Sequence, residues 1–199
     1  NNPTGTYLDV DAVRSLAVAC ADGLLVVDEA YAPFVKDSWT AASLLPCGNV
    51  VVLRSMTKDM ALAGLRLGYA LLPSSVGQCI LDVQPPWSVN ALAQAAGLAC
   101  SVEREYVRQC RALVDAEVQR LRAAVARLGW TALPTAANFF LVDVGDAARF
   151  RRHLLRRGVL VRDCSSFGLP RHVRIAARTP PEGDRLLAVM EEVSQDCRG

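Results

Sequence analysis

The stretch Ser55-Met-Thr-Lys-Asp-Met-Ala-Leu-Ala-Gly-Leu-Arg-Leu-Gly-Tyr69 decides the fold of this chain. The apolar run at residues 50–53 precedes it, which is typical of a buried strand in a parallel sheet. Lys58 follows this strand closely and lies eight residues before Arg66. Because residues after the carboxyl ends of such strands face the ligand crevice of open α/β sheets, we predict that this stretch lines a binding site.

A second apolar run, residues 24–27, leads directly into Asp28-Glu-Ala-Tyr31. Asp28 is therefore also expected at the carboxyl end of a strand. A lysine can hold pyridoxal phosphate as a Schiff base, an aspartate can pair with its ring nitrogen, and an arginine can clamp its phosphate. Lys58, Asp28 and Arg66 together predict a pyridoxal 5'-phosphate site.

The composition indicates a globular protein with ample material for a core. Of the 199 residues, 52% are hydrophobic and 21% are charged, and the formal net charge is only +2. So mild a charge does not indicate a nucleic-acid or membrane surface, and no run of 18 uncharged apolar residues predicts a membrane span. The start Asn1-Asn-Pro-Thr-Gly5 does not resemble a signal peptide. We therefore expect a cytoplasmic protein without nucleic-acid or membrane partners.

The cysteines predict neither a disulfide framework nor a metal site. Their number is odd and no C-x-x-C pair occurs, the seven positions being Cys20, Cys47, Cys79, Cys100, Cys110, Cys164 and Cys197. Several lie in apolar runs, which is typical of small buried side chains in a reducing compartment.

Strand and helix patterns alternate along the chain. We expect strands at residues 24–27, 50–53, 67–72, 130–133, 139–144, 159–162 and 173–176. We expect helices from Asp9 or Asp11 to residue 21, after residues 87–90, and at residues 103–128, 147–157 and 182–195. The long helix at residues 103–128 predicts a boundary between two α/β units.

Four motifs in this order resemble fold-type I pyridoxal-phosphate enzymes: residues 1–5, residues 27–31, the Lys58 stretch, and Val173-Arg-Ile-Ala176. The chain is most similar to the histidinol-phosphate aminotransferase group, which includes threonine-phosphate decarboxylase-like members. The resemblance covers the whole chain, but family members carry a further stretch before Asn-Pro-Thr-Gly. It implies a partial fold-type I large domain at residues 1–110, with a mostly parallel sheet and flanking helices. Residues 111–199 would form the small C-terminal α/β domain.

The resemblance implies a role for each residue at the cofactor. Asn2 and Tyr31 would bond the 3-oxygen of the ring, and Asp28 would pair with the ring nitrogen. Lys58 would form the Schiff base and carry the proton at the substrate α-carbon. Three residues would bind the cofactor phosphate: Ser55, Thr57 and Arg66.

It also implies three substrate contacts. Arg174 would bind the α-carboxylate, Asn138 would lie near that carboxylate, and Arg162 would contact a distal phosphate. The residues taken singly leave structural alternatives open, since Asp28 can be a turn or helix cap and both arginines can be charges on an edge strand.

The resemblance leaves three functions open. We expect histidinol-phosphate-type transamination first, because that group is the wider one. Decarboxylation of threonine phosphate is the alternative, since residues 84–90 and 161–169 look similar to decarboxylase-like members. The third possibility is an inactive fragment or a half-enzyme that needs a complement. At full length we expect a homodimer acting on an amino acid or amino phosphate.

Overall fold

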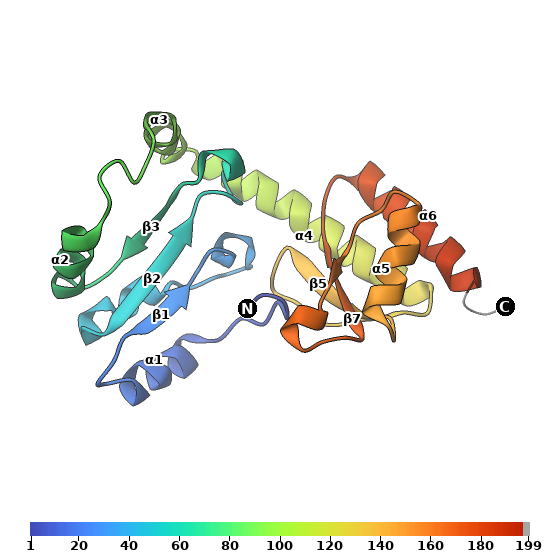
Figure 1. Ribbon diagram of the computed structural model, residues 1–199, viewed down its shortest axis with the longest axis horizontal. Coiled ribbons are helices and arrows are strands. Elements are labelled where there is room, and N and C mark those ends of the chain that lie inside the picture. The colour runs from blue at the N-terminus through green and yellow to red at the C-terminus, as the bar shows by residue number, and fades with distance from the viewer. Residues whose placement is uncertain (197–199) are drawn as a thin grey trace. The chain divides into compact units, whose positions relative to one another are not determined.

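The computed structural model describes residues 1–196, which form two compact units (Figure 1). Leu8–Cys110 forms one, here called the Lys58 unit. Asn1–Tyr7 and the chain from Arg111 onward form the other, the Arg174 unit. Cys197, the last of the seven cysteines, lies outside the described residues. Each unit has its own sheet and its own core and is described by itself.

The sheet of the Lys58 unit has the order β1-β2-β3. β1 (Leu25–Asp28) pairs in parallel with β2 (Val50–Ser55), as the apolar runs predict. β3 (Gly68–Leu71) pairs with β2 in the antiparallel direction. The predicted strands are thus found with ends shifted by one or two residues, and one of the two pairings is parallel.

One face of this sheet packs against α1 (Val10–Ala19) and the 3-10 helix η2 (Ala41–Cys47). Its buried apolar core comprises Val13, Ala17, Ala41, Leu44, Val50 and Val52. Asp9, one of the two predicted caps, starts α1, because its Oδ1 accepts a hydrogen bond of 2.7 Å from the Ala12 amide. The helix ends at Ala19, two residues earlier than predicted.

The remaining helices of the unit are α2 (Ser74–Val83), α3 (Ala91–Cys100) and the 3-10 helices η1 (Ala32–Phe34) and η3 (Ala63–Leu65). The sequence patterns predicted α3 but not α2. Pro73 precedes α2 and makes no side-chain capping bond, so the usual signal for a helix start is missing. Between α2 and α3, the side chain of Trp87 is 96% exposed.

The sheet of the Arg174 unit is antiparallel, with the order β4-β5-β7-β6. The strands are β4 (Thr131–Ala132), β5 (Phe139–Asp143), β6 (Arg162–Asp163) and β7 (His172–Ala176). The strand predicted at residues 159–162 is wrong in its position. Residues 159–161 precede β6 and do not pair with β7; Val161 is buried in the core of this unit, and Val159 packs against it.

Three helices supply the rest of this core: α4 (Arg104–Arg127), α5 (Ala147–Arg156) and α6 (Pro180–Asp196). Alternate residues of β5 and β7 face them, namely Phe140, Val142, Val173 and Ile175. A short 3-10 helix, η4 (Ser165–Phe167), follows β6. Across the described part of the chain, no helix combines the length and apolar character that a bilayer crossing requires.

Gly183 lets α6 approach a buried ion pair on α4. A Cβ at this position would lie 2.2 Å from Glu117 Oε1, and Glu117 is only 5% exposed and bound to Arg120. We expect Gly183→Ala to lower the free energy of unfolding by about 1–2 kcal/mol, because overpacking outweighs the gain in helix propensity of up to about 1 kcal/mol. Gly64→Ala is the control, since a methyl group there would meet no atom within 4 Å. Equal midpoints of urea unfolding for both variants would contradict this expectation.

Candidate active site

Lys58 lies in the loop between β2 and η3, half-buried, with its Nζ 4.7 Å from the centroid of the Tyr31 ring. Tyr31 follows β1 and Lys58 follows β2, and these two strands pair in parallel. A cation over an aromatic face is held by the quadrupole of the ring, which orients the amine. Ala61 in this loop and Arg66, which directly follows η3, have positive φ values of 54° and 59°. Such backbone strain in non-glycine residues is concentrated at functional sites.

The small hydroxyls before Lys58 form a pair. Ser55 Oγ and Thr57 Oγ1 are 2.7 Å apart, and the Thr57 amide donates to Ser55 Oγ at 3.3 Å. Arg66 donates from Nη1 to the carbonyl of Ala63 at 2.9 Å. The loop therefore offers hydroxyl and guanidinium donors close in sequence to the lysine, the donor set that a phosphate monoester requires.

Asp59, next to Lys58, is half-buried, and burial raises the pKa of its carboxyl above the usual range. Hydrogen bonding from the backbone and the charges of Arg54 and Lys58 oppose this shift. An additional anionic group thus lies beside the lysine, within the electrostatic reach of Arg54.

Asp28 ends β1 and is exposed. Its Oδ1 accepts a hydrogen bond of 2.9 Å from the Ala30 amide, so the turn role considered as an alternative is present. Even with this hydrogen bond, the carboxylate of Asp28 is exposed at the end of β1. Asp28 also pairs in register with Leu53, two residues before Ser55, on the sheet face that α1 and η2 leave uncovered.

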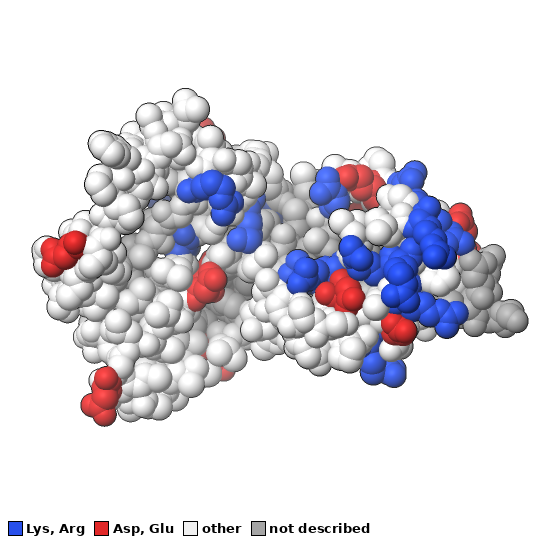
Figure 2. Space-filling view, in the orientation of Figure 1, with Lys and Arg blue, Asp and Glu red and all other residues white. Residues whose placement is uncertain are grey.

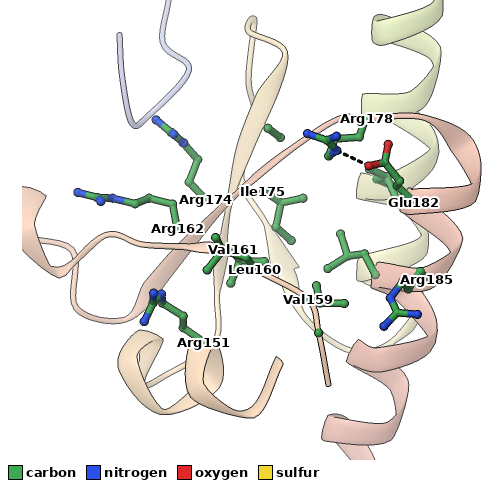
Figure 3. Close-up of a pocket in the computed structure, with 15 residues that line it drawn as sticks. Arg151, Val159, Leu160, Val161, Arg162, Arg174, Ile175, Arg178, Glu182 and Arg185 are labelled. Carbon is green, nitrogen blue, oxygen red and sulfur yellow. Dashed lines mark hydrogen bonds and ion pairs between the residues drawn. The ribbon is translucent and has the colours of Figure 1, made fainter. Parts of the chain in front are cut away.

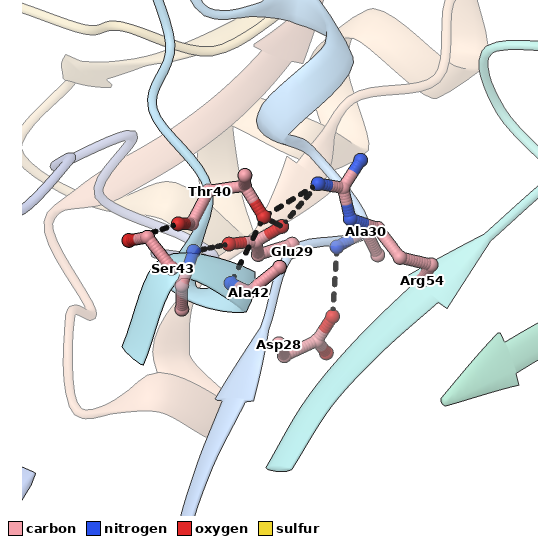
Figure 4. Close-up of polar contacts among 8 residues, drawn as sticks. Asp28, Glu29, Ala30, Thr40, Ala42, Ser43 and Arg54 are labelled. Carbon is pink, nitrogen blue, oxygen red and sulfur yellow. Dashed lines mark hydrogen bonds and ion pairs between the residues drawn. The ribbon is translucent and has the colours of Figure 1, made fainter. Parts of the chain in front are cut away.

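A polar cluster that the sequence patterns did not predict adjoins Asp28 and Ser55 in the chain (Figure 4). Glu29, which follows Asp28, is 5% exposed and forms an ion pair of 2.6 Å with Arg54, which precedes Ser55. Thr40 bonds both of them. The only signal in the sequence is that a carboxylate and a guanidinium adjoin the two strand-end motifs.

In the Arg174 unit, Arg162 of β6 and Arg174 of β7 are direct partners across the antiparallel ladder. Figure 3 shows both side chains pointing to the same side of the sheet. Arg162 donates to Ser166 Oγ at 2.9 Å and lies over the Phe167 ring, while Arg174 lies over the Phe139 ring. Two like charges in directly opposite positions repel each other, which favours an anion between them.

Two further predicted residues lie in this unit. Asn2 accepts a hydrogen bond through Oδ1 from Arg174 Nη1, so the guanidinium is tied to the first motif of the chain. Asn138 precedes β5 and its Oδ1 is buried without a hydrogen-bond partner among the described residues. An unsatisfied buried acceptor is unusual in a folded protein and is consistent with a ligand contact.

Arg162 and Arg174 also line a groove of about 590 Å³ that continues past residues 158–161 toward α6. At its far end Arg178 is paired with Glu182, whose pKa is lowered to about 2 by bonds from Thr179 and Arg178. Cationic side chains gather over this unit in Figure 2. Its sequence has 15 arginines and ten carboxylates, a net charge of +5, against −3 for residues 8–110.

The matching family model is that of aminotransferase class I and II, over residues 1–190. The chain belongs to this family. The aminotransferase chain is 41% identical over 194 residues to a histidinol-phosphate aminotransferase of Symbiobacterium thermophilum, covering 96% of this chain and 54% of the relative. It is 35% identical to histidinol-phosphate aminotransferase 1 of Nitrosococcus oceani, covering all of this chain and 55% of that protein.

Solved structures agree with this membership. The histidinol-phosphate aminotransferase of Sinorhizobium meliloti, in complex with pyridoxal-5'-phosphate, superposes with a TM-score of 0.89 at 28% identity, over 98% of this chain and 56% of that one. The L-threonine-O-3-phosphate decarboxylase of Porphyromonas gingivalis superposes with a TM-score of 0.86 at 26% identity, over 98% and 62%. The predicted partial fold-type I fold is confirmed. The aminotransferase chain spans about half the length of the curated relatives it matches.

The described residues 1–196 contain no group of three or more His, Cys, Asp or Glu side chains placed to hold a metal ion. The side chains at the ends of β1 and β2 suit pyridoxal phosphate. They comprise an amine, a carboxylate, a hydroxyl pair and an arginine, all within the Lys58 unit.

Proposed function

We propose that this chain carries the lysine-bearing part of a pyridoxal-phosphate-dependent aminotransferase of the histidinol-phosphate type. The observation that carries the proposal is the Lys58 amine, held over Tyr31 beside the Ser55–Thr57 hydroxyl pair. Pyridoxal phosphate, when bound, supplies an electron sink for the α-carbon of an amino substrate. The names of the relatives support transamination as the reaction.

In this proposal, Lys58 would hold the cofactor through its amine, and the same amine would move a proton at the substrate α-carbon. Asp28 would keep the ring nitrogen protonated, and Tyr31 and Asn2 would donate hydrogen bonds to the ring oxygen. Ser55, Thr57 and Arg66 bind the phosphate through hydroxyl and guanidinium donors. The resemblance to the family supports these assignments, and the positions of Asp28 and Lys58 after two paired strands are compatible with them.

The proposed substrate has two anionic groups. The direct pairing of Arg162 with Arg174 supports this, because a carboxylate and a phosphate would neutralise two guanidinium groups that otherwise repel each other. Arg174 would bind the α-carboxylate, with Asn138 near it, and Arg162 would bind the distal phosphate. Aromatic rings beneath both guanidinium groups support fixed orientations.

The two arginines should separate substrate classes. For phosphorylated substrates, we expect Arg162→Ala to lower kcat/KM by a factor that corresponds to about 1.5–3 kcal/mol of transition-state stabilisation, the value of hydrogen bonds to charged groups. The kcat/KM for phenylalanine should stay almost unchanged. Arg174→Ala should lower kcat/KM for histidinol phosphate, threonine phosphate and phenylalanine to a similar extent, because the proposed contact is to a group that all amino-acid substrates share, the α-carboxylate. The measurement uses the chain completed to the length of its relatives.

Arg171→Ala is the matched control for both variants. Arg171 is an exposed arginine of the same unit whose partner is Asp143, at 3.1 Å. We expect Arg171→Ala to leave kcat/KM unchanged for all three substrates. Equal losses on the three substrates for Arg162→Ala would contradict the proposed phosphate contact.

Decarboxylation of threonine phosphate remains the second candidate. The likeness to the Porphyromonas gingivalis decarboxylase supports it. The residues described above serve either reaction, so the products must decide. Release of carbon dioxide from threonine phosphate without a keto product would favour this candidate over transamination.

We also propose the assembly and the compartment. Large apolar side chains exposed on and around α2 and α3, including Leu81, Val83, Leu92 and Leu98, support a homodimer at full length.

Six described cysteines are free thiols, which supports a reducing cytoplasm. The boundary between Cys110 and Arg111 supports residues 1–110 as part of the large domain and 111–199 as the small domain. Residues 1–7 group with the chain from Arg111 onward, so the support for the large domain covers residues 8–110.

A further inference from the structure

Glu29, Arg54 and Thr40 form a polar cluster that none of the roles above uses (Figure 4). Glu29 Oε2 accepts from Arg54 Nη2 at 2.6 Å and from Thr40 Oγ1 at 3.1 Å. Glu29 Oε1 accepts from the Ala41 amide at 2.5 Å, and Arg54 Nη2 also donates to Thr40 Oγ1 at 2.9 Å. The cluster therefore joins three segments: the ends of β1 and β2 and the start of η2.

The cluster and the candidate cofactor residues lie on opposite faces of the same two strand ends. Val27 and Val52 point to the core under α1 and η2. Because side chains alternate along a strand, Glu29 and Arg54 point to that packed face, whereas Asp28 and Ser55 point to the open one. Each member of the ion pair is thus the immediate chain neighbour of a proposed cofactor contact.

Backbone hydrogen bonds connect the two faces. The Glu29 amide donates to the Leu53 carbonyl at 2.9 Å, which extends the parallel ladder one residue beyond Asp28. The Ala30 amide then bonds the carboxylate of Asp28. A shift of Glu29 relative to Arg54 would therefore move Asp28 relative to Ser55 and the Lys58 loop.

Stability alone is a weak reason for such a cluster. Glu29 is only 5% exposed, and the desolvation of a buried ion pair can cancel its attraction, so apolar residues of similar size often stabilise a protein as well or better. Compared with apolar packing, the ion pair adds a defined geometry, because each hydrogen bond forms only within a narrow range of distances and angles. A site that must hold a carboxylate and an amine at fixed separation benefits from that property.

We propose that Glu29, Arg54 and Thr40 are positioning residues that fix Asp28 and the Lys58 loop relative to each other for cofactor binding. This inference rests on the proposed function and adds three residues to it. They act through Asp28, Ser55 and Lys58, and they contact neither the cofactor nor the substrate.

The test uses Glu29→Gln, Arg54→Gln and the double variant in the protein completed to the length of its relatives. We expect each single variant to raise the Kd for pyridoxal phosphate by about 10-fold or more, the scale of a lost hydrogen bond to a charged group. Borohydride capture at Lys58 should fall in parallel at limiting cofactor. The double variant should lose no more affinity for pyridoxal phosphate than the weaker-binding single variant, because the two residues act as one unit.

Glu117→Gln and Arg120→Gln are the matched controls. Glu117 is also 5% exposed and bonds one arginine, Arg120, at 2.8 Å, but in the Arg174 unit. We expect these controls to lower Tm as the test variants do and to leave the cofactor Kd within twofold of wild type. A cofactor Kd in Glu29→Gln that stays within twofold of wild type, at a similar loss of Tm, would overturn the proposal.

Thr40 provides a milder test if the charged variants do not fold. Thr40→Val removes the hydroxyl and keeps the shape, and it should weaken cofactor binding, whereas Thr40→Ser keeps the hydroxyl and should restore it. Equal Kd values for these two variants would also overturn the proposal. If wild type takes up no cofactor at Lys58, the proposed function fails; if it does and the variants match it, only the positioning role fails.

Discussion

Replacement of Lys58 by alanine is expected to lower kcat for transamination by about 10³-fold or more, because the proton transfer and the covalent attachment both depend on its amine. The amine lies 4.7 Å from the Tyr31 ring centroid, in a loop that also contains the hydroxyl pair. Steady-state kinetics with histidinol phosphate on the completed protein would measure the loss. The visible absorbance of the bound cofactor should disappear with it.

The chain offers a matched control, since Lys36 is its only other lysine. Lys36→Ala should keep both the absorbance and the turnover. After reduction with borohydride, peptide mapping should place the label on Lys58 and not on Lys36. A label on Lys36, or normal turnover of Lys58→Ala, would contradict the assignment.

Asp28→Asn is expected to raise the activation free energy by about 3 kcal/mol or more, by analogy with the removal of one partner of a buried charge pair. The asparagine keeps the shape and can still accept the bond from the Ala30 amide at 2.9 Å, so the turn should persist. What disappears is the negative charge that would hold a proton on the ring nitrogen. The measurement is kcat with the cofactor bound at saturation.

Asp9→Asn is the control for this change. Asp9 also accepts a backbone hydrogen bond, at 2.7 Å from Ala12, but it caps α1 and has no proposed role at the cofactor. We expect that variant to turn over normally. If Asp28→Asn with bound cofactor had the same kcat as Asp9→Asn, Asp28 would serve only as a turn residue.

The sequence by itself predicted the elements whose signals are local. Apolar runs of four residues predicted β1 and β2, and the residues after them predicted where Asp28 and Lys58 would lie. The cap at Asp9 and the long α4 likewise follow from short-range patterns. Such signals suffice because a strand end or a helix cap depends on a few neighbouring residues.

The tertiary structure alone decided how distant residues pair. It moved the expected strand at residues 159–162 to Arg162–Asp163 and set Arg162 opposite Arg174. It also joined Glu29 to Arg54, 25 positions apart, through a single ion pair. Strand register and buried polar pairs depend on packing across the whole core, where a shift of one residue turns every side chain to the other face. Local sequence patterns do not contain that information, because the packing that selects among registers involves residues from every layer of the unit.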